Sequence, residues 1–403
     1  MVIGMNILVI TPLYYIQGRP NLLHDTSAIH YLIRPWAAEY NVLVVNVYFE
    51  SLRKIKRYIS KEERTLRKGY EYTVDGVKVG MIEVLKPYKQ RSRLTVYEAM
   101  RVKRYIKEFA DRNSFLPDII VTHIPITVIN AVCDIYPNVP KYAVLHTTDR
   151  TEWKRNKRET QRVRDTFDAF FVRSKNLYDF FKNQELKRLR DEILFSGGKK
   201  ADGIIPKRHE NVGLMYAGKL IAQKNVDIII KALSFLEGKY KFVFEIYGDG
   251  SEREKLQELA RKSLSSNSYR FMGKVSHEEV LNAMARNDFF VMVSKNECFG
   301  LTYVEAMVNN CIPIGTTGEG IDGIIKDGIN GFLVKADDVE ALKEKLEECF
   351  KLSDICKREI EHSICECSKT YSEESAARHY LKSFIDEYIE CGYGGCCEHN
   401  RKN

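Results

Sequence analysis

The sequence predicts an α/β protein with two domains, each built on a doubly wound and mostly parallel sheet. Its 403 residues exceed the roughly 250–300 at which a single hydrophobic core stops growing. Short apolar runs alternate with amphipathic segments along both halves of the chain, as in successive βα units. A polar stretch with glycine and proline, residues 196–211, interrupts this alternation, and we interpret it as an interdomain linker.

The first domain is expected to run from residue 1 to residue 195. Apolar runs predict strands at residues 6–13, 41–49, 118–124, 141–147 and 168–174. Segments with helical character occupy residues 28–39, 94–112, the stretch up to 133, and 176–189, and residues 54–68 form a basic helix or loop. Asp75 and Gly76 divide an alternating segment, residues 72–85, which predicts a β-hairpin.

The second domain, residues 212–372, repeats the same rhythm. Strands are predicted at residues 213–219, 241–249, 269–274, 288–295, 312–316 and 331–335. Helices are predicted at residues 226–236, 252–262, 276–285, 301–307 and 338–352, and Ser276 with Glu279 forms a capping box. A last amphipathic helix, near residues 373–390, is expected to pack back on the first domain, and residues 391–403 are expected to be a flexible tail.

Composition argues for a cytoplasmic protein. No window approaches 18 consecutive apolar residues, and residues 1–14 resemble a core strand more than a signal peptide. The ten cysteines are scattered, several of them inside predicted core elements, which favours reduced thiols over a disulfide framework. Residues 391–399 offer four potential ligands but lack the spaced pairs of a structural zinc site, so a frayed terminus is the favoured interpretation.

The net charge of +8 is concentrated in the first domain. Residues 51–112 carry eighteen Lys/Arg against eight Asp/Glu, and residues 150–164 add seven basic residues. A basic face can meet an anionic membrane surface or a phosphorylated acceptor, although an ordinary solvated face fits as well. No interleaved aromatic motif accompanies these charges, so nucleic acid is not an expected partner.

Two acids, Glu297 and Glu305, lie eight residues apart where the predicted strand 288–295 leads into a helix. Ligands bind at this carboxyl edge of open α/β sheets, and carboxylates bind hydroxyl groups there. The backbone N–H groups at a helix start form an anion site, here those of Phe299, Gly300 and Leu301. Two hydroxyl-binding acids around a phosphate-binding turn suit a nucleotide-sugar.

A structural interpretation of the same acids stays open. Thr302 and Glu305 have the spacing of a capping box, in which the glutamate satisfies the N–H groups of its own helix. Glu297 can equally be a solvated loop acid.

Two lysines, Lys219 and Lys224, flank the turn after the second domain's first strand. Fixed cations there would stabilise the charge that develops on a leaving nucleoside diphosphate. The segment Tyr247-GDG-Ser251 is only a weak dinucleotide fingerprint, because it lacks the third glycine. The strand end from Gly273 to Val275 offers backbone groups to a base edge.

Five segments of the second half, in order, resemble the retaining, nucleotide-sugar-dependent glycosyltransferases of family four, which have the GT-B fold. They are YAGKLIAQKNVD, FEIYGDGSEREKL, FMGKVSHEEV, VSKNECFGLTYVEAM and IIKDGINGFLV. The resemblance implies two Rossmann-like domains that face a central cleft. It implies that Glu305 binds ribose and Glu297 the transferred sugar. It implies that Lys219 and Lys224 bind the diphosphate. The backbone amides of Phe299, Gly300 and Leu301 would contact the phosphate and the sugar, and Gly273 through Val275 would lie beside the base.

The first half resembles the family less closely. Gly18 lies in the loop where the family has paired glycines beside the donor phosphates, and Arg19 is a possible extra phosphate contact. His146 follows a strand in a segment similar to the family's His-Gly-x-Asp element, which implies a contact with a distal sugar hydroxyl. A histidine satisfied at a strand end is the alternative. Asn310 stands where the family favours glycine, and Lys219 where it more often has arginine.

The resemblance implies a retaining, metal-independent glycosyltransferase. Its donor would be a nucleotide-sugar and its acceptor a sugar or lipid-linked glycan, as in polysaccharide or glycoconjugate synthesis. It needs no cofactor, and it would be cytoplasmic, with peripheral membrane attachment through the basic domain. A sugar-nucleotide epimerase with the same fold, a non-catalytic sugar-nucleotide-binding subunit and a basic nucleic-acid-binding protein are the competing hypotheses.

Overall fold

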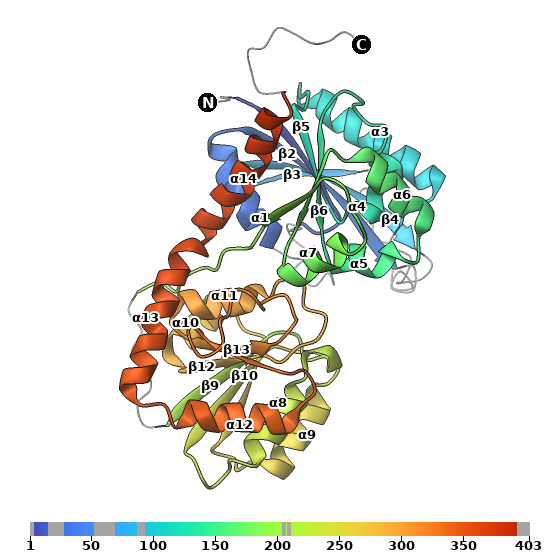
Figure 1. The fold of residues 1–403 in the computed structure, drawn as a ribbon. Helices are drawn as coiled ribbons and strands as arrows, with labels where there is room; N and C mark the ends of the chain where they lie inside the picture. Colours follow the sequence, from blue (N-terminus) through green and yellow to red (C-terminus); the bar gives the residue numbers. More distant parts are fainter. Residues whose placement is uncertain are drawn as a thin grey trace. The chain divides into compact units, whose positions relative to one another are not determined.

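The computed structural model describes residues 4–14, 28–51, 69–86, 93–203, 207 and 211–392. The predictions for Gly18, Arg19 and residues 54–68, and most of the expected tail, lie outside these residues. The chain divides into two compact units (Figure 1). Unit 1 comprises Met1–Arg173, Leu177–Leu194 and Ala377–Asn403, and unit 2 comprises Ser174–Asn176 and Phe195–Ala376.

Unit 1 contains an eight-stranded sheet in the order β3-β4-β2-β1-β5-β6-β7-β8. Every neighbouring pair is parallel except β3 and β4, which form the predicted hairpin around Asp75 and Gly76. Both turn residues have positive φ, as a tight hairpin turn requires. The strands are β1 (Asn6–Thr11), β2 (Asn41–Ser51), β3 (Tyr70–Val74), β4 (Val77–Lys86), β5 (Ile119–His123), β6 (Lys141–Leu145), β7 (Ala169–Val172) and β8 (Leu189–Ile193).

Helices cover both faces of this sheet. On one face α3 (Val96–Arg112) packs against α4 (Pro125–Val132), which in turn packs against α6 (Lys157–Thr166). The opposite face holds η1 (Arg34–Ala38) and the C-terminal helix α14 (Glu373–Glu390). The remaining helices of this part of the chain are α1 (Ala28–Ile33), α5 (Thr147–Trp153) and α7 (Lys175–Lys182).

Aromatic side chains hold α14 on the sheet of unit 1. The Phe384 ring lies 5.2 Å from Phe171 and 6.0 Å from both Tyr142 and Trp36, measured between centroids. The Trp36 indole N–H also donates a 2.9 Å hydrogen bond to the Ala377 carbonyl. The last helix of the chain thus completes the core of the first sheet, in which Phe384 is fully buried.

Unit 2 contains a six-stranded, fully parallel sheet in the order β11-β10-β9-β12-β13-β14. In chain order this is 3-2-1-4-5-6, the arrangement of a Rossmann domain. Its strands are β9 (Val212–Ala217), β10 (Phe242–Tyr247), β11 (Tyr269–Gly273), β12 (Phe289–Val291), β13 (Ile312–Thr316) and β14 (Phe332–Val334).

Two groups of helices cover the second sheet, one on each face (Figure 1). The first group is α8 (Val226–Ser234), α9 (Arg253–Ser263) and α12 (Val339–Phe350). The second is α10 (His277–Arg286), α11 (Leu301–Val308) and α13 (Asp354–Thr370). Ser276 and Glu279 form the predicted capping box at the start of α10. Within the described residues, no helix combines the length and the apolar character that crossing a bilayer demands.

Two segments near the boundary between the units are joined to each other. The Gly198 N–H donates a 2.8 Å hydrogen bond to the Tyr371 carbonyl, and Gly198 forms a parallel bridge with Ser372. A Cβ on Gly197 would lie 2.3 Å from the Ser372 carbonyl oxygen, so only glycine permits this approach. The Asn309 side chain fixes the following residues, since it contacts the Lys199 carbonyl and the Ala201 N–H.

One sequence prediction about secondary structure was wrong, and one helix was missed. The helix expected to run to residue 189 ends at Lys182, and β8 follows it after two residues with positive φ, Glu185 and Arg188. Helix α13 was not predicted, because only Ile360 and Ile364 of its seventeen residues are buried.

Removing the Phe384 side chain should selectively destabilise unit 1. We expect Phe384→Ala to lower the free energy of unfolding by about 3–5 kcal/mol, because a fully buried ring leaves a cavity. Both tryptophans of the chain, Trp36 and Trp153, lie in unit 1, so tryptophan fluorescence in guanidinium chloride reports on that unit. The exposed Ile389 on the same helix provides the control, and Ile389→Ala should cost less than about 1 kcal/mol. Equal losses in the two variants would contradict this packing role.

Candidate functional site

The candidate site in unit 2 lies at the carboxyl ends of β9 and β12. These strands are hydrogen-bonded neighbours, yet chain order reverses between them, because β10 lies on the far side of β9 and β13 on the far side of β12. At such a switch point the connecting loops diverge and leave a crevice in which open α/β sheets bind ligands. The two loops concerned are residues 218–225 and 292–300.

Lys224 and Glu297 meet across these two loops in an ion pair between Nζ and Oε2. Each side chain keeps 20% of its surface exposed, so both remain within reach of a ligand. The Ser294 hydroxyl donates a 3.3 Å hydrogen bond to the same carboxylate oxygen. A lysine and a glutamate therefore lie side by side at the switch point.

Backbone and side-chain hydrogen bonds hold the two loops together beneath this pair. The Lys295 N–H donates to the Gln223 carbonyl at 3.0 Å, and the Gln223 side chain donates back to the Lys295 carbonyl at 2.9 Å. Asn225, in the left-handed conformation, donates its amide to the Val293 carbonyl at 2.9 Å. The position of Lys224 is thus set by the loop that carries Glu297.

Lys219 is exposed on the first of these loops, and its carbonyl accepts a 2.9 Å hydrogen bond from the Tyr216 hydroxyl. Two hydrogen bonds join this turn to the turn after β10. The Gly218 N–H donates to the Tyr247 carbonyl, and the Leu220 N–H donates to the Asp249 carbonyl, each at 3.0 Å. Lys219 therefore projects from a rigid turn.

The glycines of the segment 247–251 have a packing role. A Cβ on Gly248 would lie 1.8 Å from the Gly218 carbonyl oxygen, and one on Gly250 would lie 2.3 Å from that of Leu220. Both glycines are therefore required where the turns after β9 and β10 touch. The Gly248 N–H also donates a 2.7 Å hydrogen bond to the Gly273 carbonyl. The turn after β10 is therefore joined to the end of β11 as well, next to Val275.

Gly300 starts helix α11 in the left-handed conformation, with φ 82° and ψ 54°. A Cβ there would lie 2.5 Å from the Tyr303 ring, so the position requires glycine for two reasons. Phe299 is buried before it and Leu301 is the first helical residue, so the predicted run of three residues does form the helix start.

The capping-box interpretation of Glu305 was wrong. Thr302 lies inside α11, whose N-cap is Gly300 without any side-chain cap. Glu305 is buried in the second turn, where its Oε1 accepts a 2.7 Å hydrogen bond from Nε2 of His277. His277 is the first residue of α10, and the sequence analysis missed it, because nothing in its local pattern links it to a residue 28 positions away.

The contact with Glu305 raises the pKa of the His277 imidazole, an effect that outweighs the opposing effect of partial burial. The raised pKa extends the pH range over which His277 is an imidazolium, and its N–H orients the Glu305 carboxylate. The side chain of His277 is 41% exposed, so solvent screens part of this interaction.

A second residue that the sequence analysis missed is Glu319, in the loop after β13. Its Oε2 accepts a 2.8 Å hydrogen bond from the backbone N–H of Glu297. In the same loop a Cβ on Gly320 would lie 2.4 Å from the Cys298 carbonyl oxygen. The loop after β13 thus supports the backbone on both sides of the Glu297–Cys298 peptide.

His146 lies in unit 1, directly after β6. Its Nε2 is 3.1 Å from Nδ1 of His123, so one nitrogen of the pair donates and the other accepts. Burial, and secondarily the Arg173 guanidinium, lower the pKa of His123 to about 3, and burial holds the pKa of His146 well below its usual value. Both imidazoles are therefore neutral at pH 7. Asp149, whose pKa burial raises to about 7, accepts a 2.8 Å hydrogen bond from the backbone N–H of His146.

No group of three or more His, Cys, Asp or Glu side chains is arranged to hold a metal ion in the part of the chain that the structure describes. Most of the Cys-rich tail and Gly18 lie outside that part.

We expect substitution of Gly300 by alanine to destabilise unit 2 more than the same change at Gly318. Both glycines have φ near 80°, but a Cβ on Gly318 meets no atom within 4 Å. The clash with Tyr303 should therefore cost Gly300→Ala at least about 1 kcal/mol more than Gly318→Ala. Circular dichroism during chemical denaturation measures the difference, and equal stabilities would show that Tyr303 relaxes freely.

The His277–Glu305 contact predicts a pH-dependent stability. Because the pKa of His277 is higher in the folded state than in the unfolded chain, protonated His277 stabilises the fold fully below about pH 6.5. This stabilisation is lost as the pH rises through the folded-state pKa. The stability of the wild type relative to His277→Gln should thus fall as the pH rises above about 6.5. In the Glu305→Gln variant, the pKa of His277 measured by NMR should be lower than in the wild type. An unchanged pKa would show that the contact with Glu305 is not what raises it.

Comparison with known proteins agrees with this geometry. Residues 199–363 match the family described as glycosyl transferases group 1. An uncharacterized glycosyltransferase of Methanocaldococcus jannaschii is 30% identical over 196 residues, which cover 48% of this chain and 53% of that protein. The lipopolysaccharide core biosynthesis glycosyltransferase LpsE of Rhizobium meliloti is 27% identical over 169 residues, 42% of this chain and 48% of LpsE. The chain spans about half the length of these relatives.

Solved structures extend the likeness to the whole fold. Sucrose-phosphate synthase from Thermosynechococcus elongatus has a TM-score of 0.71 at 14% identity, over 96% of this chain and 100% of that one. HepE of Anabaena, in complex with UDP and glucose, has a TM-score of 0.68 at 13% identity, over 95% and 100%. At these identities the likeness shows the fold alone. The chain thus has the GT-B fold, and its residues 199–363 match the glycosyl transferases group 1 family.

Proposed function

We propose that the protein is a retaining glycosyltransferase that moves a sugar from a nucleotide-sugar to a sugar or lipid-linked glycan. The observation that carries the proposal is the Lys224–Glu297 pair at the switch point between β9 and β12. The matching family and the named relatives support transfer of a glycosyl group. The complex of HepE with UDP and glucose supports a donor of the nucleotide-sugar class.

In this proposal the two lysines bind the diphosphate. When the bond to the sugar breaks, negative charge develops on the leaving diphosphate, and Lys219 and Lys224 stabilise that charge from fixed positions. The backbone N–H groups at the start of α11, near Phe299 and Gly300, add a partial positive charge at the same edge. These groups together would perform the task without a metal ion.

The acids in turn bind hydroxyl groups. Glu297 would accept from hydroxyls of the transferred sugar once the diphosphate draws Lys224 away from it. Glu305, held by His277, would accept from the ribose hydroxyls, with the base beside Gly273 and Val275. His146 of unit 1 would contact a distal hydroxyl of the sugar. Retention of the donor's anomeric configuration is part of the proposal because the sequence resembles a retaining family. A phosphate oxygen or a backbone carbonyl, and neither of the two acids, would support attack on the same face of the sugar.

The cellular setting belongs to the same proposal. Polysaccharide or glycoconjugate synthesis fits the acceptor class, and the name of LpsE gives one such setting for a relative. The basic charge of the first half suits peripheral contact with an anionic membrane.

Substitution of Lys224 or Glu297 by alanine should abolish transfer while leaving the protein folded. We expect each variant to lose at least about 100-fold in kcat/KM, the usual loss when one fixed charge-stabilising group is removed. Transfer of sugar from a panel of nucleotide-sugars to glycan acceptors measures the effect.

Lys231→Ala is the matched control. Lys231 forms an exposed ion pair with Asp227 on α8, so its loss removes the same charge outside the site. Near-normal turnover in Lys224→Ala would disprove the diphosphate assignment. Isomerisation of the donor without transfer would instead identify an epimerase, and donor binding without turnover would identify a binding subunit.

A further inference from the structure

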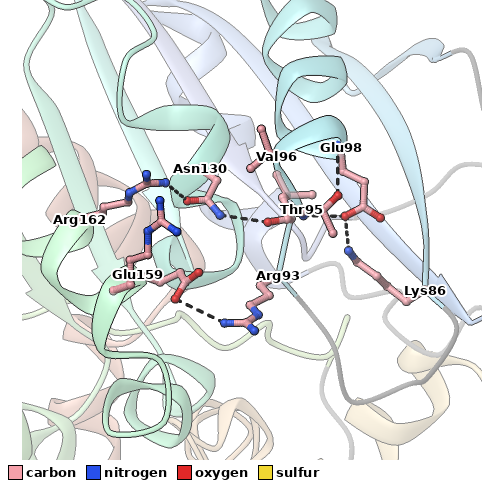
Figure 2. Close-up of a pocket in the computed structure, with 10 residues that line it drawn as sticks. Lys86, Arg93, Thr95, Val96, Glu98, Asn130, Glu159 and Arg162 are labelled. Atoms are coloured by element: carbon pink, nitrogen blue, oxygen red, sulfur yellow. Dashed lines mark hydrogen bonds and ion pairs between the residues drawn. The ribbon is translucent and has the colours of Figure 1, made fainter.

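Unit 1 has a pocket of its own, between the start of α3, the end of β4 and helices α4 and α6 (Figure 2). Its volume is about 560 Å³, within the range of small-molecule sites. Lys86 ends β4 and Thr95 precedes α3, so the pocket opens at the carboxyl edge of the first sheet. None of the residues assigned to the donor lines it.

The lining of this pocket carries excess positive charge. Two of its four basic residues are paired with carboxylates: Lys86 with Glu98, and Arg93 with Glu159 (Figure 2). Arg158 and Arg162 have no carboxylate within ion-pair distance among the described residues, and Arg162 contacts only the neutral amide oxygen of Asn130.

The two unmatched arginines lie four residues apart on α6, so they share one face of that helix. Their guanidinium groups match the geometry of a phosphate, which can accept two hydrogen bonds from each. Arg93 also donates a 2.7 Å hydrogen bond to the side-chain oxygen of Asn156, so this arginine is already held by two partners and the two arginines of α6 carry the excess charge.

Beside these charges lies an apolar surface on the first turns of α3. Val96, which lines the pocket, is 73% exposed, Tyr97 is 74% exposed and Met100 is 58% exposed. Val96 and Met100 are four residues apart and share one face of the helix. These neighbouring side chains form an exposed apolar surface beside the charged pocket, which suits contact with an apolar ligand.

We propose that this pocket binds the phosphate or diphosphate head of an amphiphilic ligand, whose apolar chain lies over Val96, Tyr97 and Met100. Arg158 and Arg162 would hold the head group. The assignment of this ligand as the acceptor rests on the proposed function, in which a lipid-linked glycan receives the sugar.

Calorimetry on the full chain, below the critical micelle concentration, tests the site with farnesyl diphosphate, inorganic pyrophosphate and farnesol. We expect farnesyl diphosphate to bind more tightly than pyrophosphate, and farnesol alone to bind weakly. In the Lys224→Ala background, which removes a lysine of the proposed diphosphate site of unit 2, Arg158→Gln with Arg162→Gln should weaken the binding of farnesyl diphosphate and of pyrophosphate by at least about tenfold. Val96→Ser with Met100→Ser should weaken farnesyl diphosphate and leave pyrophosphate unchanged.

The control replaces two exposed basic residues of α3 that do not line the pocket, Arg104→Gln with Lys107→Gln, and should change nothing. If the control lost as much binding affinity as the α6 variant, the effect would come from the overall positive charge of the protein, and the proposed site would be overturned. An unchanged preference for farnesyl diphosphate in the serine variant would overturn the amphiphilic ligand.

Lys224→Ala separates the two sites. It should weaken binding of nucleoside diphosphates and leave farnesyl diphosphate binding intact, whereas the α6 variant should do the reverse. If no nucleoside diphosphate binds but farnesyl diphosphate binding still depends on Arg158 and Arg162, the proposed function fails and the pocket proposal stands. If farnesyl diphosphate depends on Lys224 alone, the pocket proposal fails and the donor site stands.

Discussion

The close contact between the turns after β9 and β10 is the constraint on which the candidate site depends. Gly248 and Gly250 allow the two backbones to touch, and the hydrogen bonds between them fix the turn that starts at Gly218. Since that turn leads to Lys224, its rigidity sets where a cation can stand relative to Glu297. Larger side chains at either glycine would push the turns apart and move the cation without altering any charged residue.

The repeating pattern of the sequence was sufficient to predict the architecture. Parallel strands that are buried on both faces are continuous apolar runs, and such runs located most strands of both sheets. The prediction failed where burial is slight. Strand β8 pairs only with β7 at the edge of its sheet and has no buried residue, and α13 buries only two. Neither element has an apolar face strong enough to appear as a periodic signal.

The site was predictable only in part, for a related reason. Charged residues placed after predicted strands led to Lys224 and Glu297, because parallel topology brings such loops to one edge. His277 and Glu319 could not be found in this way, since their roles depend on which helices and loops touch in three dimensions. The capping-box error at Glu305 arose from one backbone angle: left-handed Gly300 starts the helix before Thr302, so that threonine is never an N-cap.

The bridge between Gly198 and Ser372 has a mechanical consequence. The chain leaves unit 1 near Leu194 and returns to it near Ala377, and the bridge ties the two passages together on the side of unit 2. Asn309 also clamps the outgoing passage to the end of α11. Residues 198–201, residues 371–372 and the end of α11 are therefore joined by hydrogen bonds into one local piece of structure, which includes the helix that carries Glu305.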